Sequence, residues 1–263
     1  MRIAHIEIGG VPRYALVEGD QLALLASDLF AEPVLDGRRV PLSGVRLLPP
    51  IIPRTFYAAG LNYKTHLREV AERDGTPLKF PEQGDVGYRA QNAIIAHDEP
   101  IIIPHDSGGK LQYEGELVAI IGKKVKHVSV DEALDCVFGY TIGNDVTERK
   151  WHSTDRTMWR GKNSDTFKPM GPWIETTVDL ENMVTTIRLN GKVVSQFQTN
   201  DMIHGVAQYI ATMSRYLTLY PGDVLWMGTD EPFIDMVDGD VVEVELSGIG
   251  TLRNPVRLGT PTD

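Results

Sequence analysis

Short apolar segments recur along most of this sequence, and Gly, Pro, Asn or Asp residues separate them. Short segments rich in β-branched and aromatic residues predict β-strands. The dipeptides Asn190-Gly191 and Asp238-Gly239 lie beside such segments and predict tight turns. Beyond residue 54, the predicted strand segments are 55–60, 93–97, 100–104, 116–122, 138–146, 171–176, 184–194, 223–228 and 240–252.

The N-terminal part of the chain has the same short apolar pieces. They end in a Pro-rich stretch, LLPPIIP, at residues 47–53. Because Pro-rich stretches are stiff, this one is typical of a connection between two folded parts. We therefore expect a small β-rich domain at residues 1–50 and a larger domain at residues 51–263.

Three segments have the pattern of helices instead. The strongest is 204–223, because its apolar residues share one face and Pro221-Gly222 would end the helix. That face comprises Val206, Ile210, Met213 and Leu217. Residues 128–139 predict a shorter helix with Ser129 and Glu132 at capping-box spacing, and residues 64–75 predict another. The predicted fold class is predominantly β with a few short helices (α+β).

Composition and charge exclude several classes of partner. The 263 residues carry a formal net charge of −10 without long runs of like charge, so we expect no nucleic-acid or membrane partner. The single cysteine, Cys136, cannot form an internal disulfide, and the N-terminus lacks a secretion-signal pattern. No apolar run approaches the ~20 residues that span a bilayer. We therefore expect a cytoplasmic protein.

Two glutamates beside the segment 116–122 are the first candidates for chemistry. Glu114 and Glu116 are two residues apart, so in a strand their carboxylates point the same way. Asp145 lies in the next predicted strand segment. Three adjacent carboxylates repel one another, and a divalent cation such as Mg²⁺ would keep them ionised. On spacing alone, the favoured alternative is a solvated edge strand, with Asp145 as a turn or capping residue.

His66 and Glu69 are a second candidate pair. They are three residues apart on the predicted helix 64–75 and so share a face. A carboxylate beside an imidazole orients it and raises its basicity, which gives a general base able to activate water. The alternative is an exposed histidine in a helical ion pair.

Lys162 and Thr229 are weaker candidates. Lys162 precedes an Asn-Ser-Asp turn, so we expect it at the start of a strand, where it could stabilise an enolate or carboxylate charge. Thr229 follows a predicted strand, and its hydroxyl could hold a substrate carboxylate. A surface lysine and an ordinary β-turn are the alternatives.

Five motifs in chain order resemble the fumarylacetoacetate hydrolase family: GLNYKTHLRE, YEGELVAIIGK, GYTIGNDVTERKW, KNSDTFKPMGPWI and MGT. The resemblance spans residues 55–255 and implies the mixed β-roll of that family at residues 51–258, after a small N-terminal domain. It implies a Mg²⁺ or Mn²⁺ ion bound by Glu114, Glu116 and Asp145.

The resemblance also implies roles for other residues. His66, Glu69 and Lys162 would be catalytic, and Thr229 would contact the substrate. Two positions depart from the family pattern: Asp230 stands where a proline is usual, and His152 where many relatives have glutamine. His152 and Arg89 are further candidates for substrate contact.

The reaction that the resemblance implies is hydrolysis of a C–C bond in an acylpyruvate-like 2-oxo acid, through a metal-bound enolate. Water activated by His66 and Glu69 would attack the distal carbonyl. The same site could instead isomerise, tautomerise or decarboxylate 2-hydroxy-dienoates or oxaloacetate-like acids, as in the catabolism of aromatic compounds. A catalytically silent metal-binding protein is a third alternative. Relatives are commonly dimers, so we expect a homodimer.

Overall fold

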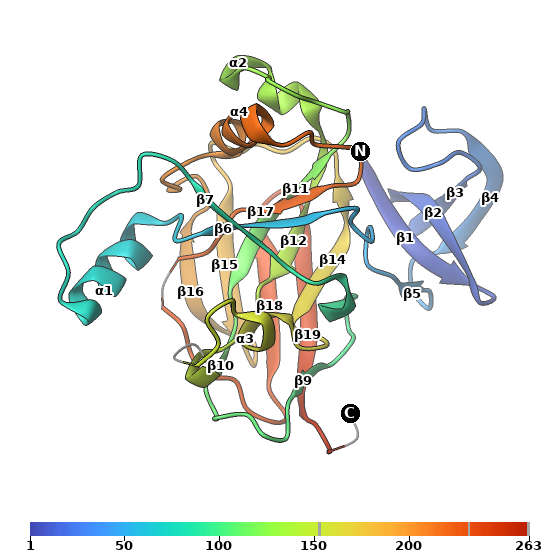
Figure 1. The fold of residues 1–263 in the computed structure, drawn as a ribbon. Helices are drawn as coiled ribbons and strands as arrows, with labels where there is room; N and C mark the ends of the chain where they lie inside the picture. The colour runs from blue at the N-terminus through green and yellow to red at the C-terminus, as the bar shows by residue number, and fades with distance from the viewer. Residues whose placement is uncertain (152–153, 231, 262–263) are drawn as a thin grey trace.

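The computed structural model describes residues 1–151, 154–230 and 232–261. Strands are the main regular structure of this chain, and they form one long twisted sheet and a smaller sheet packed against its middle (Figure 1). Across the long sheet the strands are β4 (Leu35–Pro41), β3 (Gln21–Leu25), β2 (Val11–Glu18), β1 (Arg2–Ile8), β14 (Lys168–Glu175), β12 (Val137–Asn144), β11 (Gly115–Ile121), β17 (Val224–Trp226), β6 (Phe56–Gly60) and β7 (Asp85–Tyr88), with β5 (Arg46–Leu47) beside β1 and β8 (Ile94–Ile95) beside β14.

The smaller sheet and the helices complete the fold. The smaller sheet contains, in order, β16 (Lys192–Gln198), β15 (Val184–Leu189), β18 (Val241–Leu246), β19 (Gly250–Leu258) and β9 (Ile101–Ile103), and a separate pair joins β10 (Leu111–Gln112) to β13 (Thr147–Glu148). The helices are α1 (Lys64–Asp74), α2 (Val130–Ala133), α3 (Trp159–Asn163) and α4 (Val206–Tyr216), with 3₁₀ turns η1 (Gln91–Ala93), η2 (Leu134–Cys136) and η3 (Arg149–Trp151). The predicted fold class, mostly β with short helices, is confirmed.

The N-terminal strands extend the long sheet. Strand β1 pairs with β14 through Arg2 opposite Glu175 and Ile3 opposite Ile174. Strands β1 to β4 also enclose a small apolar cluster of their own, built around Ala4, Ile6, Ala15, Leu22 and Leu24. These residues form strands because apolar side chains on alternate positions can face one core.

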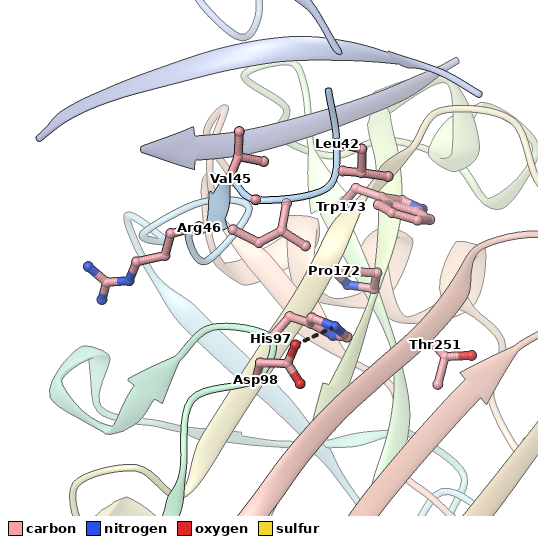
Figure 2. Close-up of a pocket in the computed structure, with 10 residues that line it drawn as sticks. Leu42, Val45, Arg46, His97, Asp98, Pro172, Trp173 and Thr251 are labelled. Carbon is pink, nitrogen blue, oxygen red and sulfur yellow. Dashed lines mark ion pairs between the residues drawn. The ribbon is translucent and has the colours of Figure 1, made fainter. Parts of the chain in front are cut away.

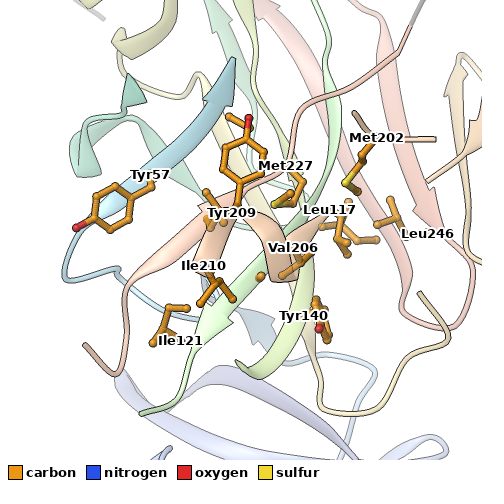
Figure 3. Packing of buried hydrophobic residues seen from close by; sticks show 14 of the residues in the cluster. Tyr57, Leu117, Ile121, Tyr140, Met202, Val206, Tyr209, Ile210, Met227 and Leu246 are labelled. Atoms are coloured by element: carbon orange, nitrogen blue, oxygen red, sulfur yellow. The ribbon is translucent and has the colours of Figure 1, made fainter. Parts of the chain in front are cut away.

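The largest group of buried apolar side chains lies between α4 and the two sheets (Figure 3). Tyr57, Leu117 and Leu246 come from β6, β11 and β18, whereas Val206 and Ile210 come from α4. Burial of each such side chain stabilises the fold by about 1.5–3 kcal/mol. The middle of the long sheet is therefore a rigid support for the ends of β11 and β12.

The three predicted helices form, but the strongest of them, α4, is shorter than predicted. Val206, Ile210 and Met213 are buried as the apolar pattern predicts, but α4 ends at Tyr216 rather than near Pro221. Leu217 is extended, and Leu219 then exchanges backbone hydrogen bonds of 2.9 and 3.0 Å with Val125. That short pairing ends the helix before the proline can do so.

The other two predicted helices also form. In α2, Ser129 and Glu132 make the predicted capping box. The segment predicted at 64–75 forms α1, which projects from the body of the molecule (Figure 1). Within the described residues, no helix is long and apolar enough to cross a membrane.

Candidate active site

Pairing of β11 with β12 brings three carboxylates together. These antiparallel strands align Gly115 with Asn144, so Glu114 and Asp145 are neighbours just beyond the paired ends. The Asp145 N–H donates to the Glu114 carbonyl at 2.8 Å, and the Glu114 N–H donates to the Asn144 side chain at 2.9 Å. One carboxylate oxygen from each of Glu114, Glu116 and Asp145 lies within 4.8 Å of the others.

The three carboxylates are buried, with exposed fractions of 7%, 2% and 1% for Glu114, Glu116 and Asp145. Strand β11 lies inside the sheet between β12 and β17. The alternative of a solvated edge strand is therefore wrong. The sequence pattern could not decide this, because an E-x-E repeat looks the same on an edge strand and on a buried one.

Four cationic side chains surround this acidic triad. Lys162 Nζ lies 2.7 Å from Glu114 Oε2 and 2.8 Å from Asp145 Oδ2. Lys168 Nζ lies 2.6 Å from Asp145 Oδ1, Arg89 Nη2 lies 2.8 Å from Asp145 Oδ2, and Arg149 Nη2 lies 2.6 Å from Glu114 Oε1. The ion pairs offset the cost of burying Glu114 and Asp145.

The pKa values of the three acids differ with their partners. Burial raises the pKa of Asp145, but Arg89, Lys162 and Lys168 outweigh burial and hold this pKa well below its usual value. The pKa of Glu114 is lowered because Lys162 and Arg149 outweigh burial in the same way. Burial raises the pKa of Glu116 well above its usual value, and the neighbouring Asp145 and Glu114 raise it further.

The acidic triad fits a hard divalent cation. Carboxylate oxygens are the donors that Mg²⁺ and Mn²⁺ prefer. Glu116 is buried beside two other acids, and a cation between the three would favour its ionised form. Its Oε2 also accepts a 2.8 Å hydrogen bond from the Gly228 N–H, which fixes its orientation.

The acidic triad lines a cavity of about 270 Å³. His66 and Val70 of α1 line this cavity, as do Met158 and Thr229. The Thr229 hydroxyl is buried and has no hydrogen-bond partner among the described residues. A buried hydroxyl without a partner is unfavourable, so this one is suited to a ligand that enters the cavity.

His66 and Glu69 differ in their position on α1. The His66 imidazole lines the cavity and meets the Phe233 ring edge to face, with centroids 5.2 Å apart. Glu69, three residues on, is exposed. The structure therefore brings His66, Lys162, Thr229 and Arg89 to the cavity with the acidic triad, while Glu69 lies at the solvent side of the helix.

The expectation that Lys162 lies at the start of a strand is wrong. The residue lies in α3, whose first N–H groups bind the Asp155 carboxylate: the N–H groups of Trp159, Arg160 and Gly161 donate to it at 3.1, 2.8 and 2.6 Å. Asp155 thus starts a helix where we expect the beginning of a strand. Arg89 binds Asp145 through its guanidinium, and His152 lies outside the described residues.

Sequence reasoning missed two of the cations. Arg149 is bound by Gln112 Oε1 at 2.9 Å as well as by Glu114. Lys168 is fully buried, and burial lowers its pKa to about 7 despite the nearby Asp145. The only signal for Lys168 was a lysine inside an apolar strand, KPMGPWI, where charged residues are rare.

A second cavity, of about 390 Å³, lies between the segment 42–47 and strands β14 and β19 (Figure 2). We call it the junction pocket; His97, Asp98, Trp173 and Thr251 are among its lining residues. Its polar groups bind one another: the Arg253 N–H donates to His97 Nδ1 at 3.2 Å, and His97 Nε2 lies 3.4 Å from Asp98. The Trp173 N–H donates to the Ile249 carbonyl at 2.7 Å. Because the polar groups at the junction pocket already have partners, the candidate active site is the cavity lined by the acidic triad, which we call the acidic cavity.

Comparison with known families assigns both parts of the chain. Residues 55–257 match the C-terminal region of fumarylacetoacetate (FAA) hydrolase, and residues 1–50 match the N-terminal region of Rv2993c-like proteins. Protein Rv2993c of Mycobacterium tuberculosis is 37% identical over 272 residues, which cover 99% of this chain and 100% of that protein. The mitochondrial oxaloacetate tautomerase Fahd2a of Rattus norvegicus is 31% identical, over 82% of this chain and 71% of its own length.

Solved structures agree with these matches. The 5-carboxymethyl-2-hydroxymuconate delta-isomerase of Mycobacterium smegmatis has a TM-score of 0.89 at 35% identity, covering 98% of this chain and 100% of that one. The maleylpyruvate hydrolase of Sphingobium sp. SYK-6, in complex with manganese(II) and pyruvate, has a TM-score of 0.81 at 26% identity, covering 99% and 100%. This chain therefore belongs to the fumarylacetoacetate hydrolase family.

Proposed function

We propose that this chain is a divalent-metal-dependent enzyme that interconverts the keto and enol forms, or the double-bond isomers, of a small 2-oxo acid. The observation that carries the proposal is that two kinds of chemical group line one cavity. Glu114, Glu116 and Asp145 converge there, and the His66 imidazole lines the same cavity from α1. A cation site beside a proton carrier suits proton transfer next to a carbonyl group.

The acidic triad would hold Mg²⁺ or Mn²⁺, which when bound supplies a Lewis acid that polarises the substrate carbonyl. The Thr229 hydroxyl, which is buried without a partner in the described structure, would donate to the substrate carboxylate. Lys162 and Arg149 already lie at the acidic triad and would offset negative charge on the substrate. The chain thus has separate groups for the carboxylate and for developing charge.

His66 would move the proton. Its imidazole would accept a proton from one carbon of the substrate and return it to another carbon or to the enol oxygen, so the molecular formula does not change. One proton carrier is enough for this reaction, whereas hydrolysis also needs a held water molecule. The similarity to an isomerase along almost the whole chain and to an oxaloacetate tautomerase supports this choice.

Hydrolysis of an acylpyruvate-like C–C bond is the second candidate. Glu69 follows His66 by one turn of α1, so a movement of that helix could bring both side chains to a water molecule. The similarity to a maleylpyruvate hydrolase supports this alternative. Decarboxylation of an oxaloacetate-like acid would use the same cation site.

One panel of substrates separates these reactions. The protein would be incubated in D₂O with Mg²⁺ or Mn²⁺ and with oxaloacetate, hydroxymuconate-type dienes and acylpyruvates, and the products identified by mass. Deuterium incorporation faster than with the metal ion alone, without any other change of formula, supports the proposal. Gain of water with release of pyruvate would show hydrolysis instead, and loss of CO₂ would show decarboxylation. His66→Ala is the matched inactive control.

We also propose that the enzyme is a homodimer. Two large aromatic side chains, Trp159 and Tyr216, are 69% and 71% exposed in the single chain and are suited to a contact between copies. Sedimentation equilibrium tests this: a single-chain mass across the working concentration range would contradict it.

A further inference from the structure

Helix α1, which carries His66, begins without a cap of its own. Its N-cap residue is Tyr63, which makes no side-chain capping bond, and its first turn contains no acidic residue. The first N–H groups of a helix have no partner within the helix, and helices usually rely on a nearby Ser, Thr, Asp or Asn to bind them. Helix α1 therefore depends on some other part of the chain at this end.

Asp230 supplies that missing group from far along the sequence. Its Oδ1 accepts a 3.1 Å hydrogen bond from the backbone N–H of His66 itself. His66 is the third residue of α1, which is the position that an N-cap side chain normally binds. The Asp230 side chain is largely buried, and a carboxylate there also opposes the positive end of the helix dipole.

The segment that contains Asp230 is also tied to the acidic triad. Two residues earlier, the Gly228 N–H donates to Glu116 at 2.8 Å. Asn62, just before α1, donates from its side chain to the Met227 carbonyl at 2.9 Å. Residues 227–230 therefore connect the acidic triad to both the approach and the first turn of α1.

A second contact comes from Phe233, three residues after Asp230 in the sequence. The Phe233 ring meets the His66 ring on one side, with centroids 5.2 Å apart. The Arg149 guanidinium lies 4.7 Å from the centre of the Phe233 ring and binds Glu114 at 2.6 Å. Asp230 and Phe233 thus touch the backbone and the imidazole of His66, respectively, and both contacts lead back to the acidic triad.

The geometry points to Asp230 as a positioning residue that caps α1 from a distance and so holds the His66 imidazole in the cavity that the acidic triad also lines. This inference rests on the proposed function for its catalytic consequence, but the cap itself does not depend on the reaction. In the sequence, Asp230 is a departure from the family pattern, since it stands where a proline is usual. In the structure, this aspartate accepts the hydrogen bond that caps α1.

Amide hydrogen exchange of α1 tests the cap directly. In the wild-type protein, the His66 amide should exchange more slowly than the exposed Lys64 amide. Asp230→Ala should speed exchange in residues 64–74 by about fivefold, the equivalent of a typical cap. Asp230→Asn keeps an oxygen acceptor and should restore exchange to near the wild-type rate. The matched control is Asp238→Ala, because Asp238 accepts a 2.7 Å bond from the Leu258 N–H, away from α1.

Kinetics and metal binding test the positioning role. Asp230→Ala should lower kcat about fivefold and leave Mn²⁺ affinity, measured by calorimetry, within twofold of wild type. Asp230→Asn should recover most of kcat. If Asp230→Asn is as impaired in kcat as Asp230→Ala while its α1 exchanges at the wild-type rate, the carboxylate acts on the substrate rather than through the cap, and the inference is overturned. Unchanged exchange of α1 in Asp230→Ala overturns it as well.

The two proposals fail in different ways. If the wild-type protein converts no 2-oxo acid, the proposed function fails, while the exchange rates of α1 still decide the cap. If Asp230→Ala does not fold, the comparison of the His66 and Lys64 amides in the wild type, together with Asp230→Asn, decides it. Equal exchange at His66 and Lys64 would contradict the cap.

Discussion

The acidic cavity and the junction pocket contain similar residue types but use them differently. Each has a histidine, a carboxylate and an arginine, and the junction pocket is the larger, at about 390 Å³ against 270 Å³. In the junction pocket, Asp98 meets His97 at 3.4 Å and Arg253 at 2.5 Å. In the acidic cavity, three buried carboxylates converge and the Thr229 hydroxyl has no partner in the described residues.

This difference shows what marks a chemical site. Opposite charges that pair at the surface contribute little and need no ligand. Like charges that converge in a buried place cost free energy, and here the ion pairs of Glu114 and Asp145 offset only part of that cost, since the pKa of Glu116 stays raised. Neither cavity size nor residue type separates the two regions; the arrangement of charge does.

The largest expected effect is at His66. His66→Ala should lower turnover by about 10²–10⁴-fold, because it removes the proton carrier, and leave metal affinity unchanged. Steady-state kinetics with Mg²⁺ and calorimetry measure the two effects. His105→Ala, which changes an exposed histidine, is the control. If turnover of His66→Ala stays within threefold of wild type, a residue other than His66 carries out the proton transfer.

The next effect is on the metal site. Glu116→Gln should weaken Mg²⁺ or Mn²⁺ binding more than tenfold, or at least about 1.4 kcal/mol, because it removes a charged ligand from a hard-cation site. Isothermal calorimetry measures the affinity. Glu82→Gln makes the same change at an exposed position and should have no effect. Equal affinities for the two variants would remove Glu116 from the ligand set.

The sequence predicted much of the fold because its signals are local. The apolar face of α4 and the capping box of α2 depend on residues within one helix, and both are present. The end of α4 was wrong because a pairing between Leu219 and Val125 decides it, and no local pattern reveals that contact.

The candidate site was predictable where a motif keeps its residues together. Glu116 lies in β11 and Glu114 directly before it, and the spacing also marked Asp145 and His66, which the family resemblance then favoured over their alternatives. The position of Lys162 was wrong because Asp155 caps an unexpected helix. Lys168 and the cap at Asp230 were not predicted, because each depends on a partner that is distant in the sequence.

Thr229→Val should separate a role in binding from a role in folding. A hydrogen bond to a charged group contributes about 1.5 kcal/mol, so KM should rise about tenfold while the free energy of unfolding stays constant. Stability is kept because the buried Thr229 hydroxyl loses no partner in the described structure.

The control is Thr185→Val, since the Thr185 hydroxyl lies 2.8 Å from that of Thr199. That change should destabilise the fold by about 1–3 kcal/mol in urea unfolding. If Thr229→Val loses as much free energy of unfolding as Thr185→Val, the Thr229 hydroxyl stabilises the fold rather than binding the substrate.

The smallest effect is expected in the junction pocket. Burial lowers the pKa of His97 in the folded protein, although Asp98 partly opposes this. Below about pH 6.5 the unfolded chain binds a proton at this residue that the folded chain does not, so stability falls as the pH falls. His97→Gln removes that difference and should make the free energy of unfolding less dependent on pH between about 6.5 and 5, with turnover unchanged. Urea unfolding at several pH values measures the slope, and His105→Gln, at an exposed position, should leave it as in the wild type.

If His97→Gln lowered turnover as His66→Ala does, the junction pocket would belong to the active site, and the contrast between paired and convergent charges would fail.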